Sequence, residues 1–365
     1  MQIIDCDIHQ PNPTHEEWLE FLDEPYRTEV ARYGPRRVNS GLRFEEGGSR
    51  WDLQEPINGI RPSEPAFYST QLFDRYGIQA GLLSGNNGLV AGIPDPDYVE
   101  ALARALNDYY LERWIPADPR FNLSLRVAQQ DPAEAVRVID RLGDHPRVVS
   151  VSVFVTANRI AFGERFYWPL YEAAQRHNLP LHFHPSTTAV IANAASTAAG
   201  MATTYLESHV CLPQFYMAQV ASMVLNGVFE KFPRLRVGLI EGGISWLPHL
   251  LWRMDSEFRG LRQQVPFLKR MPSEYVRSNV RLATQPLEEP DNPKYLGQIF
   301  DMVGGDDIVM YASDFPHWDF DEPDRIGRAL PGADLDKIMH GNAAEFFNLG
   351  DDLTKRTTLH AQDVA

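Results

Sequence analysis

Short apolar runs rich in β-branched residues recur eight times along the chain, and longer stretches with helical periodicity separate them. Several runs are apolar at consecutive positions, as strands buried on both faces must be. Strands alternating with helices are typical of a parallel sheet in an α/β protein, and eight of them favour a closed (β/α)8 barrel, the TIM barrel. The predicted strands are Ile3–Cys6, Ala80–Leu83, Leu123–Val127, Val148–Val153, Leu181–His184, Val237–Ile240, Val280–Ala283 and Ile308–Tyr311.

Helix start signals agree with this alternation. Asp131, Pro132 and Glu134 stand at the N-cap, N1 and N3 positions of a predicted helix that runs to Leu142. Periodicity alone does not separate a closed barrel from an open, doubly wound sheet. However, no GxGxxG or GxxxxGK[ST] motif follows any predicted strand, which removes the usual support for the open sheet.

The length fits one barrel with an insertion. The chain has 365 residues, and TIM barrels run from about 200 to over 400. We expect a single domain over 1–350, with residues 10–69 folded over the barrel mouth as a cover insertion after the first strand, because a structureless connection of that length would be unusual elsewhere. The polar residues 351–365 are expected to form a flexible tail.

Charge and composition exclude several partners. Acidic residues outnumber basic ones by 49 to 34, giving a formal charge of −15, which disfavours binding to nucleic acid or an anionic membrane. No apolar run approaches the roughly 18 residues that span a bilayer. Cys6 and Cys211 cannot form a disulfide scaffold, and the first residues lack a basic signal-peptide region, so we expect a cytoplasmic protein.

Ligand-type side chains collect at four of the predicted strand ends, where TIM barrels place their catalytic groups. The residues with these side chains are Asp7 and His9 on the first strand, His182 and His184 on the fifth, Glu241 after the sixth, and Asp314 and His317 after the eighth. Imidazoles and carboxylates together suit zinc, manganese or iron. A divalent ion bound there would activate water or polarise a substrate oxygen at neutral pH.

Several longer stretches resemble the amidohydrolase-related group that includes aminocarboxymuconate semialdehyde decarboxylase and γ-resorcylate decarboxylase, within the amidohydrolase superfamily. They are IDCDIH at 4–9, LFDRYGIQAGLLS at 72–84, YWPLYEAAQRHNLPLHFHPS at 167–186, GVFEKFPRLRVGLIEGGISWLPHLLWRMD at 227–255 and YASDFPHWD at 311–319. The resemblance covers nearly the whole chain and implies the amidohydrolase barrel and a homo-oligomer.

The resemblance also implies a role for each site residue. Asp7, His9, His184 and Asp314 would hold one divalent ion, zinc or manganese, with Asp7 standing where the family has the first histidine of its His-x-His motif. Glu241 falls on the family's catalytic histidine of the sixth strand. A glutamate there would act as general acid or base if burial raises its pKa, or would bridge to a second ion.

Four further residues are weaker candidates for a second metal or for substrate binding. Three of them are histidines, His182, His209 and His317, each of which is also a plausible packing or surface histidine. The fourth is Arg61, in the cover insertion, which would grip a substrate carboxylate.

Three functions remain open at this point. The leading one is a metal-dependent hydrolase or decarboxylase acting on a small polar, carboxylated substrate, with Glu241 transferring the proton. The second is a dinuclear non-haem oxygenase with an Fe/Fe or Mn/Fe centre, in which Glu241 is a metal ligand, as in a few relatives in the superfamily. The third is a non-catalytic partner subunit that forms a complex with a related chain.

Overall fold

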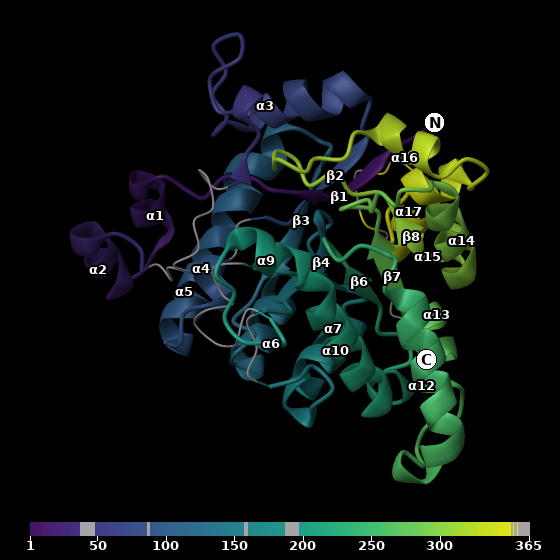
Figure 1. Cartoon of the computed structure of the whole chain (residues 1–365). Helices are drawn as coiled ribbons and strands as arrows, with labels where there is room; N and C mark the ends of the chain where they lie inside the picture. Colours follow the sequence, from purple (N-terminus) through teal and green to yellow (C-terminus); the bar gives the residue numbers. More distant parts are fainter. Residues whose placement is uncertain are drawn as a thin grey trace.

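The computed structural model describes residues 1–36, 48–85, 88–156, 160–186, 197–351, 353 and 356. Within these residues eight parallel strands form one sheet in the order β1-β2-β3-β4-β5-β6-β7-β8. Figure 1 shows the strands at the centre of the molecule, surrounded by helices. The strands are β1 (Ile4–Ile8), β2 (Ala80–Leu83), β3 (Phe121–Arg126), β4 (Val148–Phe154), β5 (Leu181–His184), β6 (Val237–Leu239), β7 (Val280–Ala283) and β8 (Val309–Met310).

The sheet closes on itself between β8 and β1. The Cys6 amide donates to the Tyr311 carbonyl at 3.0 Å, and the His9 amide donates to the Phe315 carbonyl at 2.7 Å. These bonds join the first and last strands beyond the short β8 ladder, so the carboxyl ends of all strands meet at one rim. The predicted (β/α)8 barrel is confirmed.

Helices follow the strands around the outside of the sheet (Figure 1). They are α1 (His15–Phe21), α2 (Tyr26–Tyr33), α3 (Pro65–Tyr68), α4 (Gly88–Ala91), α5 (Pro96–Tyr109), α6 (Pro132–Leu142), α7 (Trp168–Arg176), α9 (Tyr205–Val210), α10 (Leu212–Leu225), α11 (Val228–Lys231), α12 (Leu247–Leu261), α13 (Pro272–Asn279), α14 (Lys294–Val303), α15 (Gly305–Ile308), α16 (Pro323–Ala329) and α17 (Asn342–Phe347).

The start of α6 shows how local sequence sets an element. The Asp131 side chain accepts hydrogen bonds from the amides of Ala133 and Glu134, at 3.0 and 3.3 Å, which satisfies donors that a helix start otherwise leaves unpaired. Val138 and Ile139 are buried. The predicted cap and the predicted end at Leu142 are confirmed.

The segment between β1 and β2 lies against two different parts of the barrel. Helix α1 packs against α2 and α5. Further along, the Arg50 amide donates to the Pro316 carbonyl at 2.8 Å and the Trp318 amide donates to the Gly48 carbonyl at 2.7 Å, which ties the segment to the loop after β8. Residues 37–47 lie outside the described residues, so a cover made by all of 10–69 stays a prediction.

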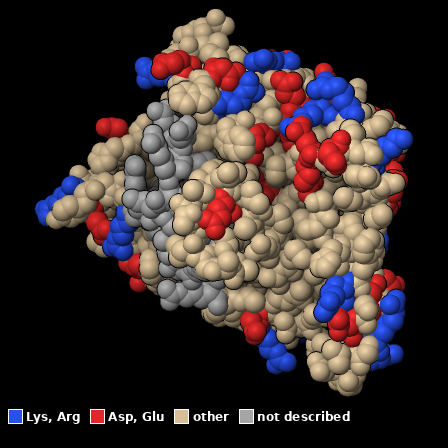
Figure 2. Space-filling view, in the orientation of Figure 1, with Lys and Arg blue, Asp and Glu red and all other residues tan. Residues whose placement is uncertain are grey.

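The predicted tail, 351–365, also lies largely outside the described residues. Among its described positions, Arg356 is buried and its amide donates to the Pro146 carbonyl at 2.9 Å. No helix in the described part of the chain has both the length and the apolar content to cross a bilayer. Figure 2 shows one face of the molecule, on which the Lys and Arg side chains are scattered around the edge and are not gathered into one basic patch.

Candidate metal centre

Two candidate ligands come from the end of the first strand. Asp7 lies in β1, and His9 follows the last residue of β1, so alternation puts both side chains on one face of the strand. Asp7 is fully buried, and His9 is nearly so. The strand runs two residues beyond the predicted Ile3–Cys6, and this extension carries Asp7 into the barrel interior.

Three other strand ends contribute to the same place. His184 is the last residue of β5, Glu241 follows β6, and Asp314 lies in the loop after β8; all three are buried. Glu241 and Asp314 have left-handed backbone conformations, with φ of 59° and 61°. Non-glycine residues in this region carry strain that is commonly found at functional sites.

The polar atoms of these residues lie close together. His9 Nε2 is 3.2 Å from His184 Nε2, 3.5 Å from Asp7 Oδ2 and 2.9 Å from Asp314 Oδ1. His184 Nε2 is 3.4 Å from Asp7 Oδ2 and 3.2 Å from Glu241 Oε2. Two imidazole nitrogens therefore face each other among three carboxylates.

This arrangement fits a divalent ion. Four ligands held at about 2.1 Å in a tetrahedron lie about 3.4 Å from one another, which matches the spacing of the atoms around His184. In addition, Asp7 Oδ2 is buried and makes no hydrogen bond within the described residues, whereas Asp314 Oδ1 has the imidazole nitrogens of His317 and His9 at 2.6 and 2.9 Å. A buried carboxylate oxygen without a donor is costly, and a metal ion would satisfy it.

The electrostatics point the same way. Burial alone would lower the pKa of His9, but the charges of Asp7 and Asp314 raise it well above its usual value. Burial likewise opposes ionisation of Asp7, yet His9 and His184 hold its pKa well below the usual range. Burial, followed by the Asp314 charge, raises the pKa of Glu241 well above its ordinary value. The cluster thus stabilises positive charge at its centre.

The donors form two overlapping groups, in each of which all ligand atoms lie within 4.8 Å of one another. The first contains Asp7, His9, His184 and Glu241; the second contains His9, Glu241, Asp314 and His317. The four ligands implied by the resemblance are thus divided: Asp314 groups with His317, whose Nδ1 is 2.6 Å from Asp314 Oδ1, and not with Asp7. His9 and Glu241 belong to both groups.

The structure places the weaker candidates at varying distances from this cluster. His182 is fully buried, and its ring centroid lies 6.0 Å from that of His184. Burial lowers the pKa of His182 to about 3. His209 lies in α9 with Nε2 3.6 Å from Asp319 Oδ2. Arg61 is not brought to the cluster, because its side chain is 75% exposed and its nearest acidic partner is Glu64, at 3.8 Å.

The residues that donate hydrogen bonds to the candidate ligands were not predicted from the sequence. The Ser84 hydroxyl, at the end of β2, donates to Asp7 Oδ1. The Gln285 amide donates to both Asp314 Oδ2 and Asp319 Oδ2, at 3.1 and 3.0 Å. Burial, followed by the Asp314 charge, raises the pKa of Asp319 to about 8. The only sequence signal for Ser84 and Gln285 is their position just after predicted strands.

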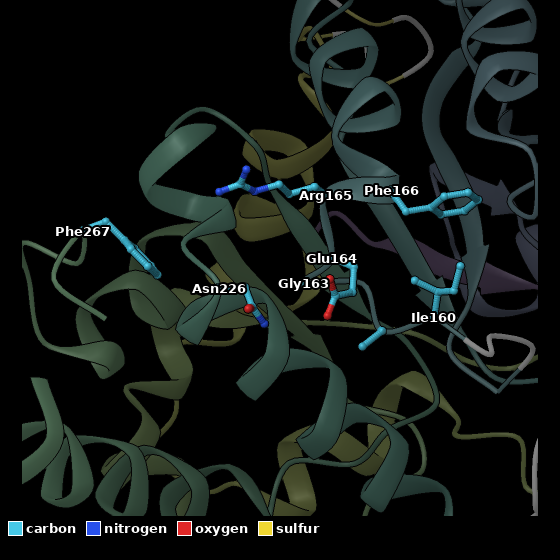
Figure 3. Close-up of a pocket in the computed structure, with 8 residues that line it drawn as sticks. Ile160, Gly163, Glu164, Arg165, Phe166, Asn226 and Phe267 are labelled. Atoms are coloured by element: carbon cyan, nitrogen blue, oxygen red, sulfur yellow. The ribbon is translucent and has the colours of Figure 1, made fainter. Parts of the chain in front are cut away.

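Two described cavities differ in their relation to the cluster. A cavity of about 420 Å³ is lined by His9 and His317, together with residues of the segment that precedes α3. Another, of about 570 Å³, lies between residues 160–166, the end of α10 and Phe267, and none of the clustered donors lines it. Figure 3 shows this second cavity, with Phe267 across from Ile160 and Phe166. The first cavity therefore gives access to the candidate metal centre.

A family model described as amidohydrolase matches residues 4–349. The chain is similar to the γ-resorcylate decarboxylase of Polaromonas sp., with 26% identity over 291 residues that make up 76% of this chain and 86% of that protein. It is also similar to the γ-resorcylate decarboxylase of a Rhizobium species, with 22% identity over 86% of this chain and 95% of that one.

Solved structures share the fold. An amidohydrolase from Mycobacterium avium subsp. paratuberculosis superposes with a TM-score of 0.71 at 21% identity, covering 96% of this chain and 98% of that one. The 5-carboxyvanillate decarboxylase from Novosphingobium aromaticivorans, solved with manganese and 4-hydroxy-3-methoxy-5-nitrobenzoic acid, has a TM-score of 0.68 at 21% identity, with coverages of 95% and 96%.

Proposed function

The chain belongs to the amidohydrolase family, and from this premise we propose that it is a metal-dependent decarboxylase of a small, carboxylated aromatic substrate. The observation that carries the proposal is the buried cluster of Asp7, His9 and His184, with its unpartnered oxygen and facing imidazole nitrogens. The γ-resorcylate decarboxylases to which it is similar support removal of CO2 over hydrolysis. Manganese in a solved relative supports manganese over zinc.

Asp7, His9 and His184 would hold the ion, with Asp314 as the fourth protein donor. When bound, a divalent ion supplies positive charge that attracts and polarises a substrate oxygen. Ser84 and Gln285 fix the orientation of Asp7 and Asp314 by binding the carboxylate oxygens that face away from His9. Such outer partners commonly set how well a metal site binds.

Glu241 is the proposed proton donor. Its carboxyl group is buried beside His184, at 3.2 Å from Nε2, on the rim where the substrate must arrive. In decarboxylation the bond between the ring carbon and the carboxyl carbon breaks, CO2 leaves, and the electron pair stays on the ring. The ring carbon then accepts the Glu241 proton to form a C–H bond, and water returns a proton to the glutamate.

Assay of the manganese- or zinc-loaded chain tests this function. We expect CO2 release from 2,6-dihydroxybenzoate or 5-carboxyvanillate, and incorporation of deuterium at the vacated ring carbon when the reaction runs in D2O. The Glu241→Gln variant should keep its metal but lose about 100-fold or more in kcat, as expected when a general acid is removed. Glu257→Gln, an exposed substitution on α12, is the control. Full turnover by Glu241→Gln would remove Glu241 from the chemistry.

A second candidate function is oxygenation at a dinuclear iron or manganese–iron centre. The observation that favours it is the presence of two donor groups that share His9 and Glu241, since the Glu241 carboxylate could bridge two ions. One imidazole nitrogen binds one ion, so His9 would belong to the first ion and Asp314 with His317 to the second. Two metals per chain with iron present, and loss of one in Glu241→Gln, would support this function; a single zinc or manganese would exclude it.

Assembly, location and domain limits are further proposals. We propose one barrel domain over 1–350, supported by the match over 4–349. We also propose a homo-oligomer, as the family resemblance implies, and a location in the cytoplasm. Light scattering of the purified chain tests the oligomer, and fractionation of cells tests the location.

A further inference from the structure

A fully buried arginine lies two strands away from the strand that carries Asp7. Arg126 is the last residue of β3, which is separated from β1 by β2, and its side chain has no exposed surface. Burial lowers the pKa of Arg126 to about 10, so the guanidinium group stays charged at neutral pH. Taking this charge out of water is costly, and the hydrogen bonds that it makes inside the barrel must offset the cost.

The guanidinium group of Arg126 binds the backbone at the end of β2. Nη2 donates to the Gly85 carbonyl at 3.1 Å, and both Nη1 and Nη2 lie 3.4 Å from the Leu83 carbonyl. The backbone of Arg126 is itself held by α5, because its amide donates to Asn107 Oδ1 at 2.9 Å and its carbonyl accepts from Asn107 Nδ2 at 2.8 Å. One buried side chain therefore contacts the two carbonyls that flank Ser84.

The segment that Arg126 binds contacts both candidate ligands of the first strand. The Ser84 hydroxyl donates to Asp7 Oδ1, and the Gly85 amide donates to the Ile8 carbonyl at 3.1 Å. A Cβ atom on residue 85 would lie 2.3 Å from His9 Cα, so the Gly85 backbone packs directly against His9 and leaves no room for a side chain. A shift of this segment would therefore move the partners of both ligands.

We propose that Arg126 is a positioning residue, which sets the metal affinity of Asp7 and His9 through the end of β2. The inference rests on the proposed function in one respect, namely that the donor cluster holds a metal ion. The charge of Arg126 and its positioning role have opposite consequences. A buried cation near Asp7 repels a metal ion, so charge alone predicts tighter metal binding when Arg126 is neutralised. Positioning predicts weaker binding.

Manganese titration of the metal-stripped full chain, in competition with a chelator, measures this difference without turnover. Outer partners of metal ligands are commonly worth about 10- to 100-fold in affinity, so Arg126→Met should bind manganese at least about tenfold more weakly. Unchanged or tighter binding would overturn the proposal. Normal manganese binding by the wild type without CO2 release would instead contradict only the proposed function.

Arg147→Met is the matched control. Arg147 is also almost completely buried, and it donates to the backbone carbonyls of Pro119 and Phe121, at the opposite end of β3. Its replacement removes the same kind of bond far from the donor cluster, so manganese affinity should stay at the wild-type value. An equal loss of affinity in both variants would assign the effect to the general stability of the barrel and overturn the proposal.

Ser84→Ala tests the path from Arg126 to Asp7. If the two residues act together, the double variant with Arg126→Met should lose less affinity than the product of the two single losses. The Mn²⁺ electron paramagnetic resonance spectrum of each loaded single variant should also differ from that of the wild type, because the geometry around the ion changes. Losses that multiply, or a wild-type spectrum in Arg126→Met, would overturn the proposal.

Arg126→Lys replaces Arg126→Met if the latter does not fold. A lysine keeps the charge, but its single ammonium group does not reproduce the planar fork that binds both carbonyls. We therefore expect weaker manganese binding and the same non-additivity with Ser84→Ala. Wild-type affinity in Arg126→Lys would overturn the proposal.

Discussion

Replacing Asp7 by asparagine removes a negative charge from the donor cluster while nearly keeping the shape of the side chain. The Ser84 hydroxyl donates to Asp7 Oδ1, and an amide oxygen can accept the same bond, so the fold should survive. The oxygen that is lost as an anion is Oδ2, which faces His9 at 3.5 Å and His184 at 3.4 Å. The variant therefore tests the proposed ligand role of Asp7.

The expected size of the effect follows from linkage. Changing an outer partner of a metal ligand costs about 10- to 100-fold in affinity, so losing the charged donor itself should cost at least about 100-fold. An ion present at about 100 times its Kd stabilises a protein by about 2.7 kcal/mol, but by only about 0.4 kcal/mol at its Kd. With about 2.1 cal/mol/K of unfolding entropy per residue, these correspond to shifts in Tm of about 3.5 °C and about 0.5 °C for 365 residues.

Scanning calorimetry of chelator-stripped protein, with and without manganese at 100 times the wild-type Kd, measures both shifts. Asp291→Asn, in an exposed loop, is the matched control and should behave as the wild type. If Asp7→Asn gained the full shift of the wild type, Asp7 would not be a ligand and the reasoning would fail.

Three other perturbations test the surroundings of the cluster. Gln285→Ala removes the donor that holds Asp314 and should weaken manganese binding by about 10- to 100-fold in a competition titration with a chelator; unchanged affinity would contradict this role. Tyr68→Phe leaves the His9 carbonyl without this donor and should lower the free energy of unfolding by about 1–3 kcal/mol in urea, whereas no loss would show that the bond is not made. Asp321 is buried between β8 and α16, and its side chain accepts a hydrogen bond from the Leu287 amide at 2.9 Å. Burial raises the pKa of Asp321 to about 6, so the folded protein binds more protons here than the unfolded chain, and stability falls as pH rises from 4 towards 7. The Asp321→Asn variant should lack this part of the fall, about 3 kcal/mol, and parallel urea curves for the two proteins across this range would contradict it.

The barrel could be predicted from the sequence because burial on both faces leaves a direct trace in composition. Ala80–Leu83, Leu181–His184 and Val280–Ala283 have the predicted limits. The predicted end of β1 at Cys6 was wrong, because Asp7 interrupts the apolar pattern while the strand continues to Ile8. A charged residue inside a buried strand breaks the pattern, and here it does so at the candidate metal centre.

The gathering of ligand-type residues at strand ends could also be predicted, but their grouping could not. Asp314 lies with His317 instead of Asp7, and both His9 and Glu241 join both groups. The left-handed backbones of Glu241 and Asp314 direct their side chains in ways that strand alternation does not describe. The hydrogen bonds of Gln285 to Asp314 and of Tyr68 to His9 could not be predicted, because these partners lie 29 and 59 positions apart in sequence. Such contacts depend on how the closed barrel brings distant loops together.

The most direct test is an anomalous-scattering map from crystals of the chain grown with manganese. The proposed ligand set requires a peak within bonding distance of Asp7 Oδ2, His9 Nε2 and His184 Nε2. One such peak agrees with the decarboxylase, and a second beside Asp314 and His317 agrees with the dinuclear centre. No peak among these three atoms would contradict a metal-dependent function for this barrel.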